Sequence, residues 1–327
     1  MYYPWQQSQW RQLWRAQKEQ RLPHALLFSG VVGTGKAQFA DHFSRALLCQ
    51  QVSEEGEYCK TCHMCRLVEG KTHAGLVWIE PEKESGAIKI DQIREVREFI
   101  NQTGLQSEYR IVIVAPANQM NINAANALLK TLEEPASGAL LILICNQLSE
   151  LPATVVSRCQ HIMFPQPNRQ EALSWLIKQE GISADSAELL LNVANGAPLT
   201  ALRLVKDGVM ETRQTLLQLL YALSQRAADP IKSAASLQSE DSLVMLDFIL
   251  SFVMDLLRMQ AGADTVTNQD FKTQLTDLSV RTELQRNMKF MENLTELRKQ
   301  IGEGFNLNKL LTFEAVFIRW MECTKCF

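Results

Sequence analysis

The sequence lacks an apolar run long enough to cross a membrane. A spanning helix needs roughly 20 mostly apolar residues, and the most apolar stretch, residues 243–257, is interrupted by Asp247 and Asp255. The opening residues, MYYPWQQSQWRQLWRAQK, contain no apolar segment of the secretory-signal kind. These absences exclude a spanning helix and predict a cytoplasmic protein in which residues 243–257 form a buried helix.

Net charge is also small. The 327 residues carry a formal charge of −3, and 46% of them are apolar while 21% are charged, which is typical of folded globular proteins. A chain with so little net charge creates no strong field that would attract nucleic acid. Any contact with DNA must therefore use a local patch or a larger assembly.

The length predicts two or three domains, and the first of them covers residues 1–165. Apolar runs at 25–30, 110–115 and 140–145 are typical of parallel strands that are covered on both faces. Helical patterns such as 123–134 lie between these runs. This alternation predicts an α/β domain with helices on both sides of a parallel sheet.

The rest of the sequence is helical by pattern. Pro165 and Pro167 end the α/β region, and residues 166–208 then predict a small helical domain. Residues 209–327 are rich in Leu, Met and Gln and contain few helix breakers. They predict a second, larger helical domain.

A glycine-rich segment, GVVGTGKA at residues 30–37, follows the first predicted strand and begins a predicted helix. The phosphate-binding loop G-x-x-x-x-G-K-[ST] occurs in the same context, where backbone N–H groups and a lysine hold phosphates. The segment differs from this pattern at its last position. Ala37 stands where a hydroxyl should bind Mg²⁺, and a methyl group cannot coordinate a metal.

A second group needed for ATP hydrolysis is missing as well. Mg²⁺ and the attacking water require carboxylates at the end of a neighbouring strand, but the strand at 110–115 runs into Ala115 and Pro116. Two losses in one site indicate that the chain is no working ATPase. The remaining loop residues predict weak nucleotide binding or none; they are Gly30, Gly33, Thr34, Gly35 and Lys36.

Four of the eight cysteines form a cluster. Cys49, Cys59, Cys62 and Cys65 have the spacing C-x₉-C-x₂-C-x₂-C, and four thiolates at such short spacing in a reducing compartment suit tetrahedral Zn²⁺. Four thiolates leave no open coordination position, so the site would be structural. His63 lies between two better-spaced cysteines and is left out of the ligand set.

Two further motifs accompany the loop and the cysteines: NALLKTLEEP at 126–135 and LPATVVSRC at 151–159. With them, the sequence resembles the clamp-loader family of bacterial DNA polymerase III, over residues 1–205 by motif and beyond that by architecture only. The resemblance implies an AAA+ module with an inserted zinc knuckle. It also implies a helical lid domain at 166–208 and an all-α collar, or oligomerisation domain, at 209–327.

The departures from the motor subunits of that family point in one direction. Motor subunits keep an acidic pair where this chain has Ala115 and Pro116, a small polar sensor where it has Cys145, and a lid arginine where it has Leu199. The resemblance therefore implies a rigid subunit without ATPase activity of its own, within the DNA polymerase III holoenzyme. ATP and Mg²⁺ would not be productively bound by this chain.

Arg158, in the SRC part of the second motif, is the remaining candidate for a functional residue. The resemblance implies that it is an arginine finger, which acts in trans on ATP bound by a neighbouring subunit, while Ser157 and Cys159 shape its turn. Guanidinium suits this role because it is planar, always charged and offers forked donors to phosphate oxygens. From the pattern alone, an ordinary surface ion pair is the alternative.

The implied partners are clamp-loader motor subunits and the delta subunit in a hetero-pentamer, with the sliding clamp and primer-template DNA contacted through the complex. A helix around 243–259 is apolar over more than half of its circumference, which fits either a self-contained bundle or a collar ring. Glu133 and Glu134 are adjacent and share no helix face, so a structural role before Pro135 is expected.

Two other functions stay open at this point. The segment 30–36 would allow an active ATPase, the motor subunit of the same loader. The cysteine cluster would allow a zinc-dependent DNA-binding module, although no basic run lies near it. A terminal pair, Cys323 and Cys326, is interpreted as incidental.

Overall fold

The computed structural model describes residues 2–82, 86–101, 109–179, 181–302, 305 and 307–324. The chain divides into two compact units, residues 1–171 and 172–327. Cys326 lies outside the described residues. The finer division into a lid and a collar at residue 208 stays a prediction.

The first unit is built on a five-stranded sheet with the order β2-β3-β4-β1-β5. Every strand pair is parallel, as the apolar runs predicted. Each residue of β1 and β4 is buried, because helices cover both faces of these central strands. The strands are β1 (Ala25–Ser29), β2 (Leu76–Ile79), β3 (Arg110–Val114), β4 (Ala139–Cys145) and β5 (Gln160–Met163).

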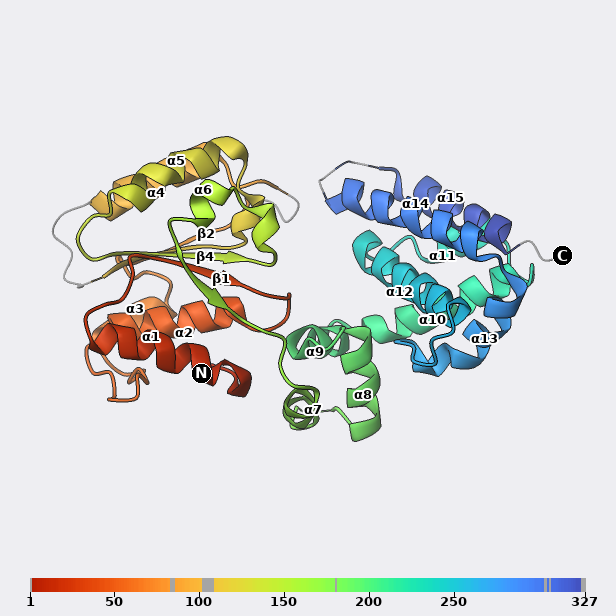
Figure 1. The fold of residues 1–327 in the computed structure, drawn as a ribbon, viewed down its shortest axis with the longest axis horizontal. Helices are drawn as coiled ribbons and strands as arrows, with labels where there is room; N and C mark the ends of the chain where they lie inside the picture. The colour runs from red at the N-terminus through yellow and green to blue at the C-terminus, as the bar shows by residue number, and fades with distance from the viewer. Residues whose placement is uncertain are drawn as a thin grey trace. The chain divides into compact units, whose positions relative to one another are not determined.

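Two layers of helices enclose the sheet (Figure 1). α1, α2 and α3 lie on one side, while α4, α5 and α6 lie on the other. The helices of the first side are η1 (Pro4–Gln6), α1 (Gln7–Lys18), α2 (Lys36–Leu48) and α3 (His63–Glu69). Those that follow are α4 (Ile90–Asn101), η2 (Ala117–Gln119), α5 (Ile122–Glu133), η3 (Leu148–Glu150) and α6 (Ala153–Val156).

The described residues of the second unit form helices and no strands. Its apolar side chains form two clusters, one within α7 to α9 and one within α10 to α15. No helix among the described residues is both long and apolar enough to span a membrane. The helices are α7 (Arg169–Ile177), α8 (Ala184–Val193), α9 (Pro198–Lys206), α10 (Val209–Ser224), α11 (Pro230–Ser236), α12 (Ser242–Gln260), η4 (Gln269–Phe271), α13 (Lys272–Arg281), α14 (Leu284–Gly302) and α15 (Lys309–Cys323).

A buried polar network lies inside the larger helical cluster. Arg213 on α10 is 1% exposed and donates to both carboxylate oxygens of Asp270, at 2.7 and 2.8 Å. It also donates to Asn268, whose backbone N–H donates to the fully buried Asp255 at 2.7 Å. The network explains how a helix as apolar as α12 tolerates an aspartate in its buried face.

Replacing Arg213 with alanine should destabilise the second unit. Removing one partner of a buried ion pair leaves the other uncompensated and costs about 3–5 kcal/mol. We expect the lower end of this range, because the side chain of Asp270 is 31% exposed. Urea unfolding followed by circular dichroism measures the change. Lys232→Ala, at an exposed position, should change stability by less than about 0.5 kcal/mol, and equal stability of the two variants would contradict the prediction.

Candidate functional site

The glycine-rich loop connects β1 to α2, as predicted, but its lysine is turned back onto the loop. Nζ of Lys36 donates to the carbonyl oxygens of Gly30 at 2.6 Å and of Val31 at 2.9 Å. The residue is only 6% exposed, and burial lowers the pKa of Lys36 to about 8. The ammonium group that would bind outer phosphates is therefore already paired with backbone oxygens of its own loop.

The N-terminal segment holds the loop from the other side. Nε1 of Trp5 donates to the carbonyl oxygen of Thr34 at 2.9 Å. Nε2 of Gln6 donates to the carbonyl oxygens of Thr34 and Gly35, both at 2.9 Å. Gly35 has φ of +89°, and a Cβ there would lie 2.6 Å from the ring of Tyr3. Only glycine fits this position, because the ring packs directly on the backbone.

The positions that should bind magnesium offer no oxygen ligand from their side chains. Ala37 packs beside the aromatic cluster on the α2 side of the sheet, and β3 leads into Ala115 and Pro116. Cys145 ends β4 and is 1% exposed, and burial raises the pKa of its thiol to about 11. A buried neutral thiol in this position is only a weak hydrogen-bond donor.

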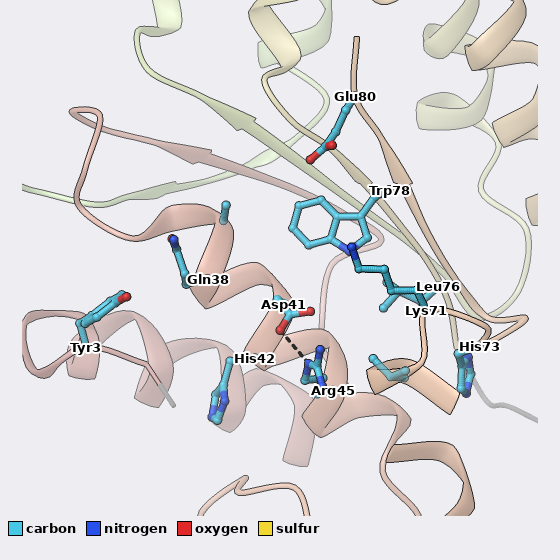
Figure 2. A pocket seen from close by; sticks show the side chains of 12 residues that line it. Tyr3, Gln38, Asp41, His42, Arg45, Lys71, His73, Leu76, Trp78 and Glu80 are labelled. Atoms are coloured by element: carbon cyan, nitrogen blue, oxygen red, sulfur yellow. Dashed lines mark hydrogen bonds and ion pairs between the residues drawn. The ribbon is translucent and has the colours of Figure 1, made fainter. Parts of the chain in front are cut away.

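A pocket of about 690 Å³ lies beside α2, between this helix and β2. Figure 2 shows Trp78 and Glu80 on one side of it and the Asp41–Arg45 ion pair on α2 on the other. The Asp41 carboxylate accepts from Nε of Arg45 at 2.7 Å. Of the glycine-rich segment only Ala37, at the magnesium position, lines this pocket, so the pocket adjoins the end of the loop without including the residues that would hold phosphates.

The four predicted cysteines come together. Their Sγ atoms all lie within 4.8 Å of one another. Zn–S bonds of about 2.3 Å in a tetrahedron require S–S separations of roughly 3.8 Å, so a small contraction around the ion gives the required geometry. The arrangement could hold a metal ion of the kind that prefers thiolates.

Backbone N–H groups point at these sulfur atoms. The Cys59 and Cys62 N–H groups donate to Sγ of Cys49 and Cys59, both at 3.3 Å, and the Cys65 N–H donates to Sγ of Cys62 at 3.4 Å. Hydrogen bonds from Thr61 and the backbone lower the pKa of the Cys59 thiol to about 6. Such donors favour thiolate, which is the form that binds metal.

The loop that carries the first cysteines is attached to α1 through two tryptophans. Nε1 of Trp10 donates to the carbonyl oxygen of Glu55 at 2.9 Å, and Nε1 of Trp14 donates to that of Glu54 at 3.0 Å. The two indoles are stacked with centroids 5.8 Å apart, and a Cβ at Gly56 would lie 2.7 Å from both. The cysteine cluster therefore fixes a loop that packs on the first helix.

Arg158 lies in the turn between α6 and β5, and its side chain is 36% exposed. Nε and Nη2 donate to Oε1 of Glu133 at 2.9 and 2.5 Å, and Nη1 donates to the carbonyl oxygen of Thr154 at 3.0 Å. Oγ of Ser157 donates to the same carbonyl at 3.2 Å. Cys159 packs inward against the α5 side of the core.

Arg158 and the glycine-rich loop lie at opposite ends of two neighbouring parallel strands, β5 and β1. The turn with Arg158 precedes β5, whose first residue Gln160 is paired with Leu26 near the start of β1. The loop follows the last residue of β1. The two are separated by at least the length of this strand, roughly 13 Å. Arg158 is therefore placed away from the phosphate loop of its own chain.

Two predicted positions belong to the second unit. Leu199 lies in the first turn of α9 and is half-buried. Because leucine is apolar, this position supplies no charge. Cys323 ends α15, where its thiol donates to the Arg286 carbonyl oxygen at 3.7 Å.

The sequence pattern did not indicate Glu133 as the partner of Arg158, nor Trp5 and Gln6 as partners of the loop. The residues of these pairs are 25 or more positions apart in the chain, so only the tertiary structure brings them together. The one available signal was that both Glu133 and Arg158 lie in the motifs on which the family resemblance rested.

Comparison with known proteins gives a consistent result for the whole chain. Residues 5–168 match the family model "DNA polymerase III, delta subunit", and residues 208–322 match "DNA polymerase III, delta subunit, C terminal". DNA polymerase III subunit delta′ of Pseudomonas aeruginosa is 35% identical, with 97% of each chain covered. The Escherichia coli subunit delta′ is 31% identical over 97% of this chain and 95% of its own.

The fold is also found among solved structures. A DNA polymerase III gamma subunit-related protein from Thermotoga maritima aligns with a TM-score of 0.50 over 97% of this chain and 100% of its own, at 20% identity. The first unit is thus an α/β AAA+ module that carries a four-cysteine knuckle, and an all-helical region follows it.

Proposed function

The chain belongs to the family of DNA polymerase III delta-prime subunits, and from this premise we propose that it is the non-hydrolysing stator of a clamp loader. In this role it helps to load the sliding clamp onto primed DNA in the cytoplasm. It supplies Arg158 as an arginine finger to ATP bound by a neighbouring motor subunit. Its own glycine-rich loop does not bind ATP and Mg²⁺ in a way that allows hydrolysis.

The observation that carries the proposal is the position of Arg158 before the start of β5, at the end of the parallel strands opposite to the glycine-rich loop. A guanidinium that is exposed and distant from its own loop can serve a triphosphate only on another chain. Ser157 and Thr154 support the turn that presents it. The loss of oxygen ligands at Ala37, Ala115 and Pro116 supports the non-hydrolysing half of the proposal.

The proposed partners are the motor subunits and the delta subunit in a hetero-pentamer. We assign the helical residues 209–327 to the collar of this assembly and residues 166–208 to the lid. The knuckle is proposed to hold structural Zn²⁺, with Cys49, Cys59, Cys62 and Cys65 as ligands. A closed set of four thiolates supplies folding energy and no open position for catalysis.

The purified chain tests the non-hydrolysing half. We expect no Mg²⁺-dependent ATP turnover above background, and no difference between the wild type and Lys36→Ala, because Lys36 is paired with its own loop. Phosphate release and equilibrium binding of ATP measure both properties. Turnover that Lys36→Ala abolishes would identify an active motor subunit instead, for which the intact residues Gly30 to Lys36 are the argument.

A further inference from the structure

Glu133 holds one edge of the Arg158 guanidinium. Its Oε1 atom accepts from both Nε and Nη2, at 2.9 and 2.5 Å. Glu133 is the last residue of α5, and α5 packs against α6, which immediately precedes the arginine turn. The carboxylate is thus anchored by a helix of the AAA+ core and not by a mobile loop.

The opposite end of the guanidinium keeps free donors. Arginine has five N–H groups, and the contacts with Glu133 and Thr154 use one on Nε, one on Nη2 and one on Nη1. One N–H on each terminal nitrogen remains. Arg158 therefore keeps two N–H donors for a phosphate while its Nε edge is held by Glu133.

We infer that Glu133 is a positioning residue for Arg158, an inference that rests on the proposed function in trans. An arginine side chain has many rotamers, and fixing it at the moment of reaction costs conformational entropy. Glu133 fixes the guanidinium before a triphosphate arrives. Glu134, adjacent in sequence, forms no hydrogen bond or ion pair with Arg158 within the part of the chain that the structure describes.

Removal of Glu133 should therefore slow hydrolysis without preventing it. The entropy of one long side chain corresponds to about 10- to 30-fold in rate. The effect should fall on kcat and leave KM for ATP unchanged, because a finger acts in the transition state. Glu133→Gln should retain most activity, since the amide oxygen can accept the same two hydrogen bonds without the charge.

The test uses the reconstituted clamp-loader complex with clamp and primed DNA, and measures single-turnover ATP hydrolysis. The variants are Glu133→Ala, Glu133→Gln, Arg158→Ala and the double variant of Glu133→Ala with Arg158→Ala. Glu134→Ala is the matched control and should behave as the wild type. In the double variant we expect the rate of Arg158→Ala alone, because Glu133 acts only through the arginine.

The outcomes distinguish the positioning role of Glu133 from the proposed function of Arg158. If Arg158→Ala slows hydrolysis while Glu133→Ala does not, the positioning role is wrong and the proposed function stands. A further loss from Glu133→Ala in the Arg158→Ala background indicates a general structural effect, and also overturns the inference. If Arg158→Ala itself has no effect, the proposed function fails.

Discussion

Replacing Arg158 with alanine is expected to slow ATP hydrolysis at the neighbouring subunit's site by about 10³- to 10⁵-fold. This loss corresponds to about 4–7 kcal/mol of transition-state stabilisation. The size follows from the low dielectric of a closed subunit boundary, where a guanidinium opposes developing charge on the transferred phosphate. An exposed ion pair with no further role contributes only about 0–1 kcal/mol, so the two interpretations of Arg158 differ by orders of magnitude in rate.

The reconstituted complex should still assemble, because Arg158 is exposed and its turn is built by backbone hydrogen bonds from Ser157 and Cys159. Clamp loading should fall with hydrolysis at the affected site, while other ATP sites keep their own rates. Arg158→Lys is the informative control. An ammonium cannot offer the planar fork, so lysine should not restore the rate. Unchanged hydrolysis and clamp loading in Arg158→Ala would reject the finger.

Loss of the proposed Zn²⁺ from the cysteine knuckle is expected to have the largest effect on stability. Structural zinc sites have apparent binding free energies of about 10–16 kcal/mol, comparable to the whole stability of a typical domain. Cys62→Ser should remove the bound metal and free residues 50–58 from Trp10 and Trp14. A loss of even about 3 kcal/mol lowers the melting temperature by about 6 °C or more for a unit of this size.

Three measurements check this prediction: metal content per chain, thermal unfolding and tryptophan fluorescence. The fluorescence should shift because the indoles of Trp10 and Trp14 are only 3% and 8% exposed and lose the loop that covers them. Cys323→Ser is the matched control, since this thiol lies on α15 in the second unit and is not one of the four clustered cysteines. Full stability of Cys62→Ser without bound metal would show that the knuckle folds by packing alone.

The central strands could be predicted from sequence because burial on both faces leaves continuous apolar runs in β1, β3 and β4. Polar residues occur only at the end of β1, as Ser29, and at the start of β3, as Arg110. The two outer strands could not. β5 has only Ile162 buried and gives no continuous apolar run. β2 is an apolar run of four residues, of which only Ile79 is buried, and so short a run does not distinguish a strand from part of a helix. Their places in the sheet depend on pairing with β1 and β3, which local patterns do not encode.

The helix at 242–260 shows a different limit. Its apolar circumference was compatible with a ring of partners, but within the second unit α12 packs against α10, α13 and α14. A central helix of a bundle is apolar on most sides without any partner. Asp255 accepts from Arg258 on its own helix and from Asn268, which lies after the helix. Sequence therefore predicted the helix and its burial, but not which neighbours cover it.

For the candidate site, residue types and short spacings were sufficient for the cysteines and for the missing magnesium groups. The contacts of Lys36 and Arg158 were not predictable in this way. A lysine in a glycine-rich loop has the same pattern whether it binds phosphate or its own backbone, and only the geometry of Gly30 and Val31 distinguishes the two. Glu133 likewise needed the packing of α5 against α6.

The lysine contacts also bear on how the subunit responds to the cell. Nucleotide-dependent switch proteins change shape because contacts to the third phosphate and its Mg²⁺ order segments that are released on hydrolysis. Here the Lys36 ammonium group already donates to carbonyl oxygens of its own loop. The side chains of Trp5 and Gln6 donate to further carbonyl oxygens of the same loop. We therefore expect the conformation of this subunit's loop to stay the same in growing and in starved cells, whatever nucleotide its neighbours bind.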